Sequence, residues 1–233
     1  MKNYSYVGIS FIILVFGIIF IPRIIDRIQS GSTLDGDRLN RTSNSDLAYI
    51  SLNGERKKVP EFLLTNQDNL PISNEDFLGK VYVVEFFFTS CPSICPIMNR
   101  NMKILEEKYG DRTDFGIASI TIDPENDTPM ELKKYAEIYD VFSPNWHFLT
   151  GERSYIYELA NSGFNIFAEI NPAVAGGFEH QGYFALVDQN GYLRSRRDDY
   201  GNPIVYYLGI DNDDAEVQDI TLLKQDIQIL LND

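Results

Sequence analysis

The chain has 233 residues, of which 44% are apolar and 23% are charged, a composition that fits one globular domain with additional length outside it. Its formal net charge is −14, from 34 acidic and 20 basic side chains. Because no basic patch is visible in the sequence, nucleic-acid binding is excluded from the expected functions.

The first segment is apolar and is separate from the predicted domain. Residues 4–22 hold a largely apolar stretch of roughly 18 residues, about the length that spans a bilayer core. Ile21-Pro22-Arg23 follows, without a small-residue cleavage site and without a cysteine for lipidation. We therefore predict a single uncleaved transmembrane anchor over 4–22, with a cleaved signal peptide as the alternative.

The charges around this anchor do not fix its orientation, because Lys2 lies on one side and Arg23 and Arg27 lie on the other. A short anchor ahead of a large domain usually exports that domain. We therefore expect a single-pass protein of the cytoplasmic membrane, with its soluble domain facing the periplasm or an equivalent extracytoplasmic space. Such a compartment is oxidising.

A polar segment separates the anchor from the domain. Residues 23–45 become rich in Gly, Ser, Asn and Asp and show no periodicity, which is typical of a flexible linker. The domain is then predicted over 46–233, a common size for a single core.

Within this domain, apolar runs and turn signals alternate in an α/β pattern. A hairpin with an Asn/Asp turn is predicted over 61–72. In chain order, the remaining expected elements are a buried strand over 81–88, a helix over 96–109, a buried strand over 115–122, a helix from 129 to about 139, a short strand over 146–149, a short helix over 154–162, a strand over 183–188 with a hairpin turn at 189–191, and a closing amphipathic helix over 217–231.

The order of these elements predicts a fold. Strand, helix, strand and helix are followed by a hairpin and a last helix, and a cysteine pair lies at the first strand–helix junction. We predict an α/β thioredoxin-like fold with an N-terminal hairpin extension, preceded by a single transmembrane helix.

Cys91 and Cys95 are the two cysteines of the chain, and they follow the apolar run 81–88 directly. A helix N-terminus stabilises thiolates, which are both nucleophiles in disulfide exchange and ligands for soft metals. Positions four residues apart on a helix face the same way, so both sulfurs can point at one small object or at each other. A purely structural disulfide is the weaker interpretation, because so short a loop adds little stability.

The donor set of this pair depends on a third ligand. Two thiolates suit linear Cu(I), whereas an added imidazole gives trigonal Cu(I) or a Cu(II) site. His180 lies in a glycine-rich loop before the strand at 183–188, and that loop is expected to pass beside the cysteine turn. We predict His180 as the third ligand; a loop imidazole without a role is the alternative. His147 lies within a predicted strand beside Trp146 and is interpreted as a structural or surface histidine.

Several motifs resemble the Sco/SenC family of cytochrome c oxidase assembly proteins. The resemblance covers residues 58–233, with the motifs in the family's order. They are Pro60-Glu61-Phe62-Leu63-Leu64-Thr65, Thr89-Ser90-Cys91-Pro92-Ser93-Ile94-Cys95-Pro96, Ile122-Asp123-Pro124-Glu125-Asn126-Asp127-Thr128-Pro129, and the block from His180 to Gly191.

The resemblance implies a thioredoxin fold that binds one copper per chain, as Cu(I) or Cu(II), through Cys91, Cys95 and His180. It also implies supply of copper to the dinuclear copper site of cytochrome c oxidase, or reduction of the cysteines of that site. The implied partners are the copper-site subunit of the oxidase and a copper donor or thiol reductant. Asp123 lies in the matching acidic motif and is expected near the site, with a helix-capping or loop carboxylate as the alternative.

This chain departs from the family pattern after the histidine, where Gln181 replaces a small hydroxyl residue, and in the segment 161–177 before it.

On the strength of the resemblance, a metallochaperone is the leading interpretation of the chain, and an enzyme is the second. In the second interpretation the protein is a thiol–disulfide oxidoreductase that reduces partner cysteines through the Cys91–Cys95 pair. Cys91 is then the attacking thiol, and His180 is dispensable. A peroxidase of the peroxiredoxin type is disfavoured by the paired thiol and the late histidine.

Overall fold

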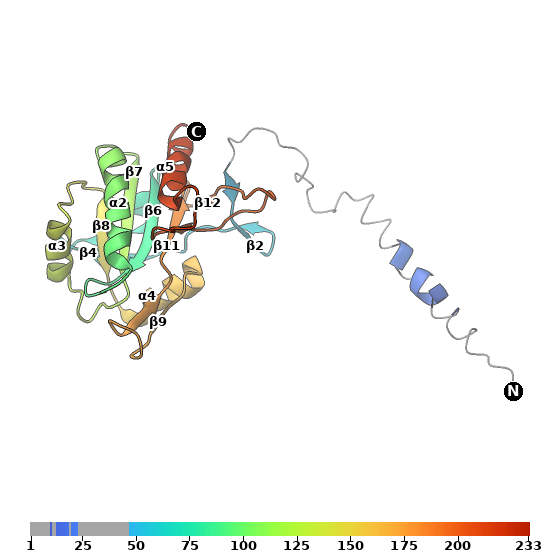
Figure 1. Ribbon diagram of the computed structural model, residues 1–233, viewed down its shortest axis with the longest axis horizontal. Coiled ribbons are helices and arrows are strands. Elements are labelled where there is room, and N and C mark those ends of the chain that lie inside the picture. Colours follow the sequence, from blue (N-terminus) through green and yellow to red (C-terminus); the bar gives the residue numbers. More distant parts are fainter. Residues whose placement is uncertain (1–9, 11–12, 19, 23–46) are drawn as a thin grey trace. The chain divides into compact units, whose positions relative to one another are not determined.

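The central element of the fold is a mixed β-sheet, shown in a computed structural model that describes residues 10, 13–18, 20–22 and 47–233 (Figure 1). In this described part the sheet has nine strands in the order β1-β12-β11-β6-β7-β8-β4-β5, with β13 paired to β11. The central strands β6, β7 and β8 run parallel, and their neighbours run antiparallel to them. The bounds are β1 Ala48–Tyr49, β4 Leu63–Asn66, β5 Pro71–Ser73, β6 Val81–Phe87, β7 Phe115–Thr121, β8 Trp146–Thr150, β11 Tyr183–Val187, β12 Leu193–Ser195 and β13 Tyr207–Leu208.

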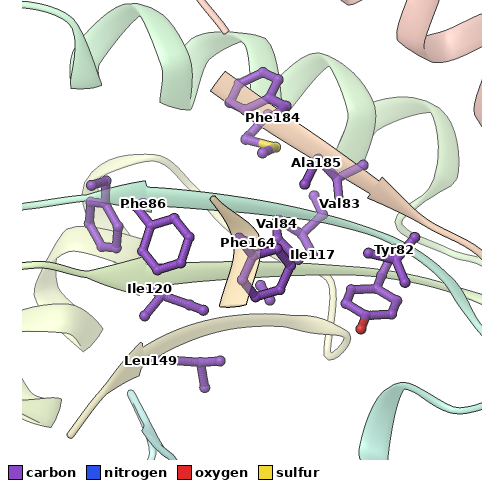
Figure 2. Packing of buried hydrophobic residues seen from close by; sticks show 14 of the residues in the cluster. Tyr82, Val83, Val84, Phe86, Ile117, Ile120, Leu149, Phe164, Phe184 and Ala185 are labelled. Carbon is purple, nitrogen blue, oxygen red and sulfur yellow. The ribbon is translucent and has the colours of Figure 1, made fainter. Parts of the chain in front are cut away.

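The two central strands are buried on both faces, which explains their unbroken apolar sequences. Every residue of β6 and of β7 is buried. Successive side chains of a strand point to opposite faces, so Phe86 packs against Phe164 on one face while Phe87 contacts Tyr135 and Phe148 on the other. Figure 2 shows part of this core, with the Phe86 and Phe164 rings among the labelled side chains.

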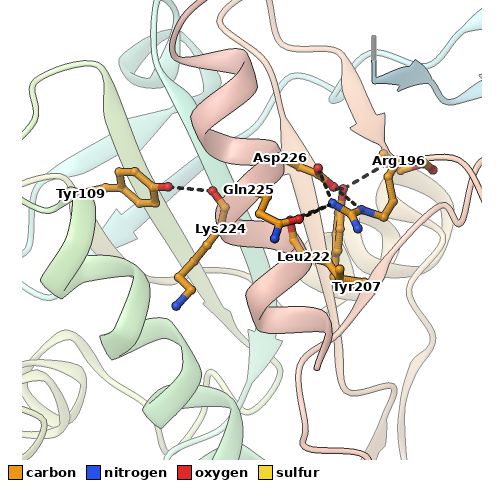
Figure 3. Close-up of polar contacts among 8 residues, drawn as sticks. Tyr109, Arg196, Tyr207, Leu222, Lys224, Gln225 and Asp226 are labelled. Atoms are coloured by element: carbon orange, nitrogen blue, oxygen red, sulfur yellow. Dashed lines mark hydrogen bonds and ion pairs between the residues drawn. The ribbon is translucent and has the colours of Figure 1, made fainter. Parts of the chain in front are cut away.

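Two helices, α2 (Cys95–Tyr109) and α5 (Asp219–Leu230), lie side by side over the sheet (Figure 1). The hydroxyl of Tyr109 on α2 donates to the carbonyl of Lys224 on α5 at 2.7 Å (Figure 3). The carboxylate of Asp226, also on α5, accepts from the Arg196 guanidinium at 2.8 Å and from the Tyr207 hydroxyl at 2.7 Å (Figure 3). These bonds attach the last helix to the sheet edge and to α2.

Shorter elements complete the domain. Helix α3 (Pro129–Ile138) contacts β8 and β4, and its N-cap Thr128 accepts from the Glu131 amide at 3.4 Å. The others are η1 Asn74–Phe77, α4 Arg153–Glu158, the π-helical turn η2 Leu159–Phe164, the hairpin of β2 Ser51–Leu52 with β3 Glu55–Arg56, and the hairpin of β9 Ala168–Ile170 with β10 Phe178–His180.

The structure confirms the predicted α/β class and most predicted elements. It also contains elements that were not predicted, namely β1, the β2–β3 hairpin, η1 and β13, and it differs from the predicted elements in three places. Helix α2 begins at Cys95, one residue earlier than predicted, with Cys91 in the preceding turn as expected, so the rule that residues four apart on one helix share a face does not apply to the pair. The helix predicted over 154–162 ends at Glu158 and continues as η2, which stops at left-handed Asn165. The predicted glycine-rich loop before residue 183 contains the β9–β10 hairpin.

The predicted transmembrane anchor lies mostly outside the described residues. Of the span 4–22, the structure describes residues 10, 13–18 and 20–22, all helical, and the predicted linker 23–45 is not described. Within the described ranges, no helix combines the length and the apolar character needed to cross a bilayer. The described residues 47–233 belong to one compact unit of the chain.

Candidate metal centre

The two cysteines lie where β6 passes into α2. After β6 ends, the Cys91 amide donates to the carbonyl of Phe88 at 3.2 Å, which closes a tight turn. Cys95 is the first residue of α2, and its amide donates to the Cys91 sulfur at 3.5 Å. An amide at the start of a helix has no carbonyl partner within the helix. The first turn of α2 therefore provides a hydrogen-bond donor that favours negative charge on Cys91.

Both cysteines are free thiols, and their environments push their pKa values apart. Hydrogen bonding from the Cys95 thiol lowers the pKa of Cys91 well below its usual range, and His180 and the Ser93 and Cys95 backbone lower it further. The same bond to Cys91, together with burial, raises the pKa of Cys95. Cys91 is also the more accessible sulfur, at 7% exposure against 0% for Cys95. Hydrogen bonding and burial thus favour the proton on Cys95 and negative charge on Cys91.

His180 approaches this pair from a different part of the chain, at the end of β10. Its Nε2 lies 3.3 Å from the Cys95 sulfur, and its Nδ1 lies 3.3 Å from the Gln181 carbonyl oxygen. Nε2 is thus the ring nitrogen that faces the cysteine pair, while Nδ1 is directed at a carbonyl oxygen, which can accept a hydrogen bond from it. The donor atoms of Cys91, Cys95 and His180 all lie within 4.8 Å of one another.

This donor set fits a copper ion. Thiolate sulfur is the soft ligand that selects Cu(I), and imidazole nitrogen suits copper in either oxidation state. Structural zinc sites generally use four protein ligands, whereas the group found among the described residues has three, and no carboxylate belongs to it. The arrangement is that of a three-coordinate centre near the surface.

Comparison with known proteins decides the family. The sequence profile of the SCO1/SenC family matches residues 51–210, well over half of the chain. The chain belongs to the SCO1/SenC family.

Relatives within this family agree in sequence and in structure. A SCO1 protein homolog of Bacillus subtilis is 38% identical over 136 residues, which cover 58% of this chain and 70% of the relative. A solved structure of BsSco, described as a member of the Sco family of cytochrome c oxidase assembly proteins with a disulfide switch, has 32% identity and a TM-score of 0.60 over 75% of this chain and 93% of that one. Bradyrhizobium japonicum ScoI, solved with copper bound, has 25% identity and a TM-score of 0.51 over 60% of this chain and 89% of that one. The α/β fold described above is therefore the thioredoxin-like Sco fold.

One residue of the acidic family motif contacts the cysteine turn, and it is Asp127. Its carboxylate accepts from the Thr89 amide at 3.0 Å, from the Thr89 hydroxyl and from the Thr121 hydroxyl. Thr89 is two residues before Cys91, so Asp127 fixes the start of the turn to the end of β7. Asp127 was not among the predicted site residues. Its burial at 1% exposure and its charge distinguish it in the structure.

Asp123, the acidic residue expected near the site, makes local bonds instead. It is 1% exposed, and one carboxylate oxygen accepts from the Asn126 side-chain amide at 2.8 Å. Its other oxygen has no hydrogen-bond partner in the described part of the chain. It is not one of the three donor residues that lie together.

The second histidine of the chain lies elsewhere. His147 is on β8, where Nδ1 lies 3.5 Å from the Asn66 side-chain amide and the ring packs edge-on against Phe77 at 5.7 Å. Burial lowers the pKa of His147. These contacts agree with the structural role predicted for it and make His147 a matched control for His180.

Proposed function

We propose that this chain is a membrane-tethered copper chaperone that binds one copper ion through Cys91, Cys95 and His180. It supplies that copper to the dinuclear copper site of cytochrome c oxidase during assembly. The observation that carries the proposal is the meeting of two sulfurs from the β6–α2 turn and one imidazole from β10 within 4.8 Å. Membership of the SCO1/SenC family, and the copper-bound structure of a relative, support the metal and the partner.

Delivery requires that a partner's ligands can replace those of the chaperone one at a time. His180 is half-buried and Cys91 is 7% exposed, whereas Cys95 is fully buried. The partner's thiolates would therefore replace His180 or Cys91 as copper ligands first, and Cys95 would be the last ligand to dissociate from the ion. A three-coordinate copper leaves room for an incoming ligand, so exchange proceeds without a free ion.

The location follows from the N-terminal segment. An apolar anchor over 4–22 and a polar linker over 23–45 would tether the domain to the cytoplasmic membrane while leaving it able to reach a membrane-embedded oxidase. We place the domain on the extracytoplasmic side. Copper loading there would also keep the two thiols from closing into a disulfide in an oxidising compartment.

A second function, reduction of the oxidase cysteines, is favoured by the low pKa of Cys91. The Cys91 thiolate would attack a partner disulfide, forming a mixed disulfide and releasing one partner thiolate. Cys95, once it loses its proton, would then attack the Cys91 sulfur and release the second partner thiolate. The partner gains two electrons, and this chain is left with a Cys91–Cys95 disulfide. The relative BsSco is described as having a disulfide switch.

One experiment separates delivery from reduction. The full chain in detergent is mixed anaerobically with the soluble copper-site domain of an oxidase, supplied with its two cysteines either reduced or as a disulfide, and copper transfer and partner thiols are both measured. Delivery predicts that His180→Ala lowers copper transfer to the reduced partner, whereas His147→Ala does not. The chaperone proposal would be overturned in favour of a reductase by the following combination of results. The copper-free chain reduces the disulfide partner, His180→Ala does not affect this reduction, and the wild-type chain transfers no copper.

A further inference from the structure

The position of His180 depends on one aromatic ring of the cysteine turn. Phe88 is 1% exposed and follows directly after β6. Its ring centroid lies 5.9 Å from that of His180, nearly perpendicular at 78°, and 5.2 Å from that of Phe178. Phe178 and His180 are alternate residues of β10 and therefore share one face of the hairpin. That face rests on the Phe88 ring.

The turn of the same hairpin also meets this ring, at Gly176. A Cβ atom on Gly176 would lie 2.9 Å from two ring carbons of Phe88 and 3.1 Å from Cδ of Pro92. Real Cβ atoms almost never approach so closely, so the hairpin can lie this near the cysteine turn only because residue 176 has no side chain. Gly176 also has a φ of +89°, which favours glycine.

Phe88 contacts both parts of the chain that supply the donor atoms, the cysteine turn and the β9–β10 hairpin with His180. Its carbonyl accepts the Cys91 amide bond, and its ring supports His180. The residue is itself held firmly, because β6 is buried along its whole length and Asp127 fixes the next residue, Thr89. The Phe88 ring therefore has a fixed position, and the β9–β10 hairpin packs against it with the His180 imidazole directed at the cysteines.

We propose that Phe88 and Gly176 are the positioning residues of the metal centre: the Phe88 ring seats the β9–β10 hairpin, and the missing side chain of Gly176 lets it seat closely enough for His180 to reach the cysteine sulfurs. The inference deepens the proposed function, on whose ligand set it rests. Neither residue touches the metal, and both act through His180. Groups that orient a metal ligand typically change metal affinity by about 10–100-fold when they are replaced.

The chain offers a matched control in the next residue. Gly177 has a φ of +81°, so a side chain there meets the same backbone penalty as at Gly176. Nothing lies within 4 Å of a Cβ built at Gly177, however. Gly176→Ala and Gly177→Ala therefore share the conformational cost and differ in the contact with Phe88 and Pro92.

The first test uses the metal-free full chain in detergent and needs no copper. The chain has two histidines, so the ring signals of His180 and His147 are readily assigned by NMR. We expect nuclear Overhauser contacts between the His180 and Phe88 rings in wild type and in Gly177→Ala, and their loss in Gly176→Ala, while the His147 contacts to Phe77 remain. Retention of the His180–Phe88 contacts in Gly176→Ala would overturn the inference, whatever the protein does with copper.

The second test measures anaerobic Cu(I) affinity. Gly176→Ala is expected to bind about 10–100-fold more weakly than wild type and Gly177→Ala within about threefold of it. In the His180→Ala background, Gly176→Ala should cause no further loss, because it acts through the imidazole. Phe88→Leu, which keeps an apolar side chain in the core, should behave like Gly176→Ala. Equal losses in the two glycine variants, or full additivity with His180→Ala, would refute a positioning role, whereas absence of copper binding in wild type would refute the proposed function instead.

Discussion

Glu85 is a carboxyl group buried in the middle of β6, and its replacement tests the electrostatics beneath the metal centre. It is 0% exposed; one oxygen accepts from the Ser119 hydroxyl at 2.6 Å, and that hydroxyl accepts from the Trp146 indole at 3.0 Å. The other oxygen has no hydrogen-bond partner among the described residues. Burial raises the pKa of Glu85 from 4.5 to about 7, although the bond from Ser119 opposes the shift.

The sign of the pH effect follows from this raised pKa. Between pH 4.5 and about 7 the folded chain keeps the proton on Glu85 while the unfolded chain releases it, so stability falls as the pH rises through that window. The full penalty is present above pH 7. Each tenfold change in proton affinity is worth about 1.4 kcal/mol, so the penalty amounts to about 3 kcal/mol.

Glu85→Gln removes this charge and retains an oxygen that can accept from Ser119. The free energy of unfolding of the reduced full chain is measured by urea titration from pH 4 to pH 8, for wild type and for the variant. We expect the variant to gain about 3 kcal/mol relative to wild type between the two ends of this range. All other carboxylates are common to both proteins, so they cancel in the difference. Parallel stability curves across the whole range would refute the reasoning.

Three further predictions test the surroundings of the site. Asp127→Ala removes the partner of the Thr89 amide and hydroxyl and should lower the free energy of unfolding by about 2–3 kcal/mol in urea titration; wild-type stability would show that these bonds are dispensable. Hydrogen bonding from Cys95 lowers the pKa of Cys91, so the Cys91 sulfur should be alkylated by iodoacetamide at a nearly constant rate from pH 5 to 8. A tenfold rise in this rate per pH unit would show that Cys91 is protonated across the range. Asp226→Ala leaves Arg196 without its carboxylate and should cost about 2–3 kcal/mol by the same titration, whereas an unchanged midpoint would mean that this ion pair adds no stability.

The buried strands β6 and β7, helices α2 and α3 and the cysteine turn were predictable from the sequence because their signals are local. An unbroken apolar run marks a strand that is buried on both faces, and Thr128 followed by Pro129 marks a helix start. The family motifs added the association of His180 with the two cysteines. Each of these signals lies within about ten consecutive residues.

The β9–β10 hairpin was not predictable, because side chains and distant contacts determine it. The Asn161 side chain makes two hydrogen bonds with the backbone of Ala168, as a neighbouring strand would. Its Oδ1 accepts from the Ala168 amide at 3.1 Å, and its Nδ2 donates to the Ala168 carbonyl at 2.9 Å. Gln181 likewise accepts from the Phe167 amide at 3.0 Å. Neither contact leaves a periodic pattern in the sequence. The residues that departed from the family pattern, Gln181 and the segment 161–177, are thus the ones that build the support of His180.

X-ray absorption at the copper edge reports the ligands of the proposed copper centre. The full chain is loaded anaerobically with one equivalent of Cu(I) in detergent, as wild type, His180→Ala and His147→Ala. We expect two sulfur ligands and one imidazole nitrogen in wild type and in His147→Ala, and loss of the imidazole signal in His180→Ala. An imidazole signal that persists in His180→Ala, or copper that does not remain bound to the wild-type chain, would contradict a centre built from Cys91, Cys95 and His180.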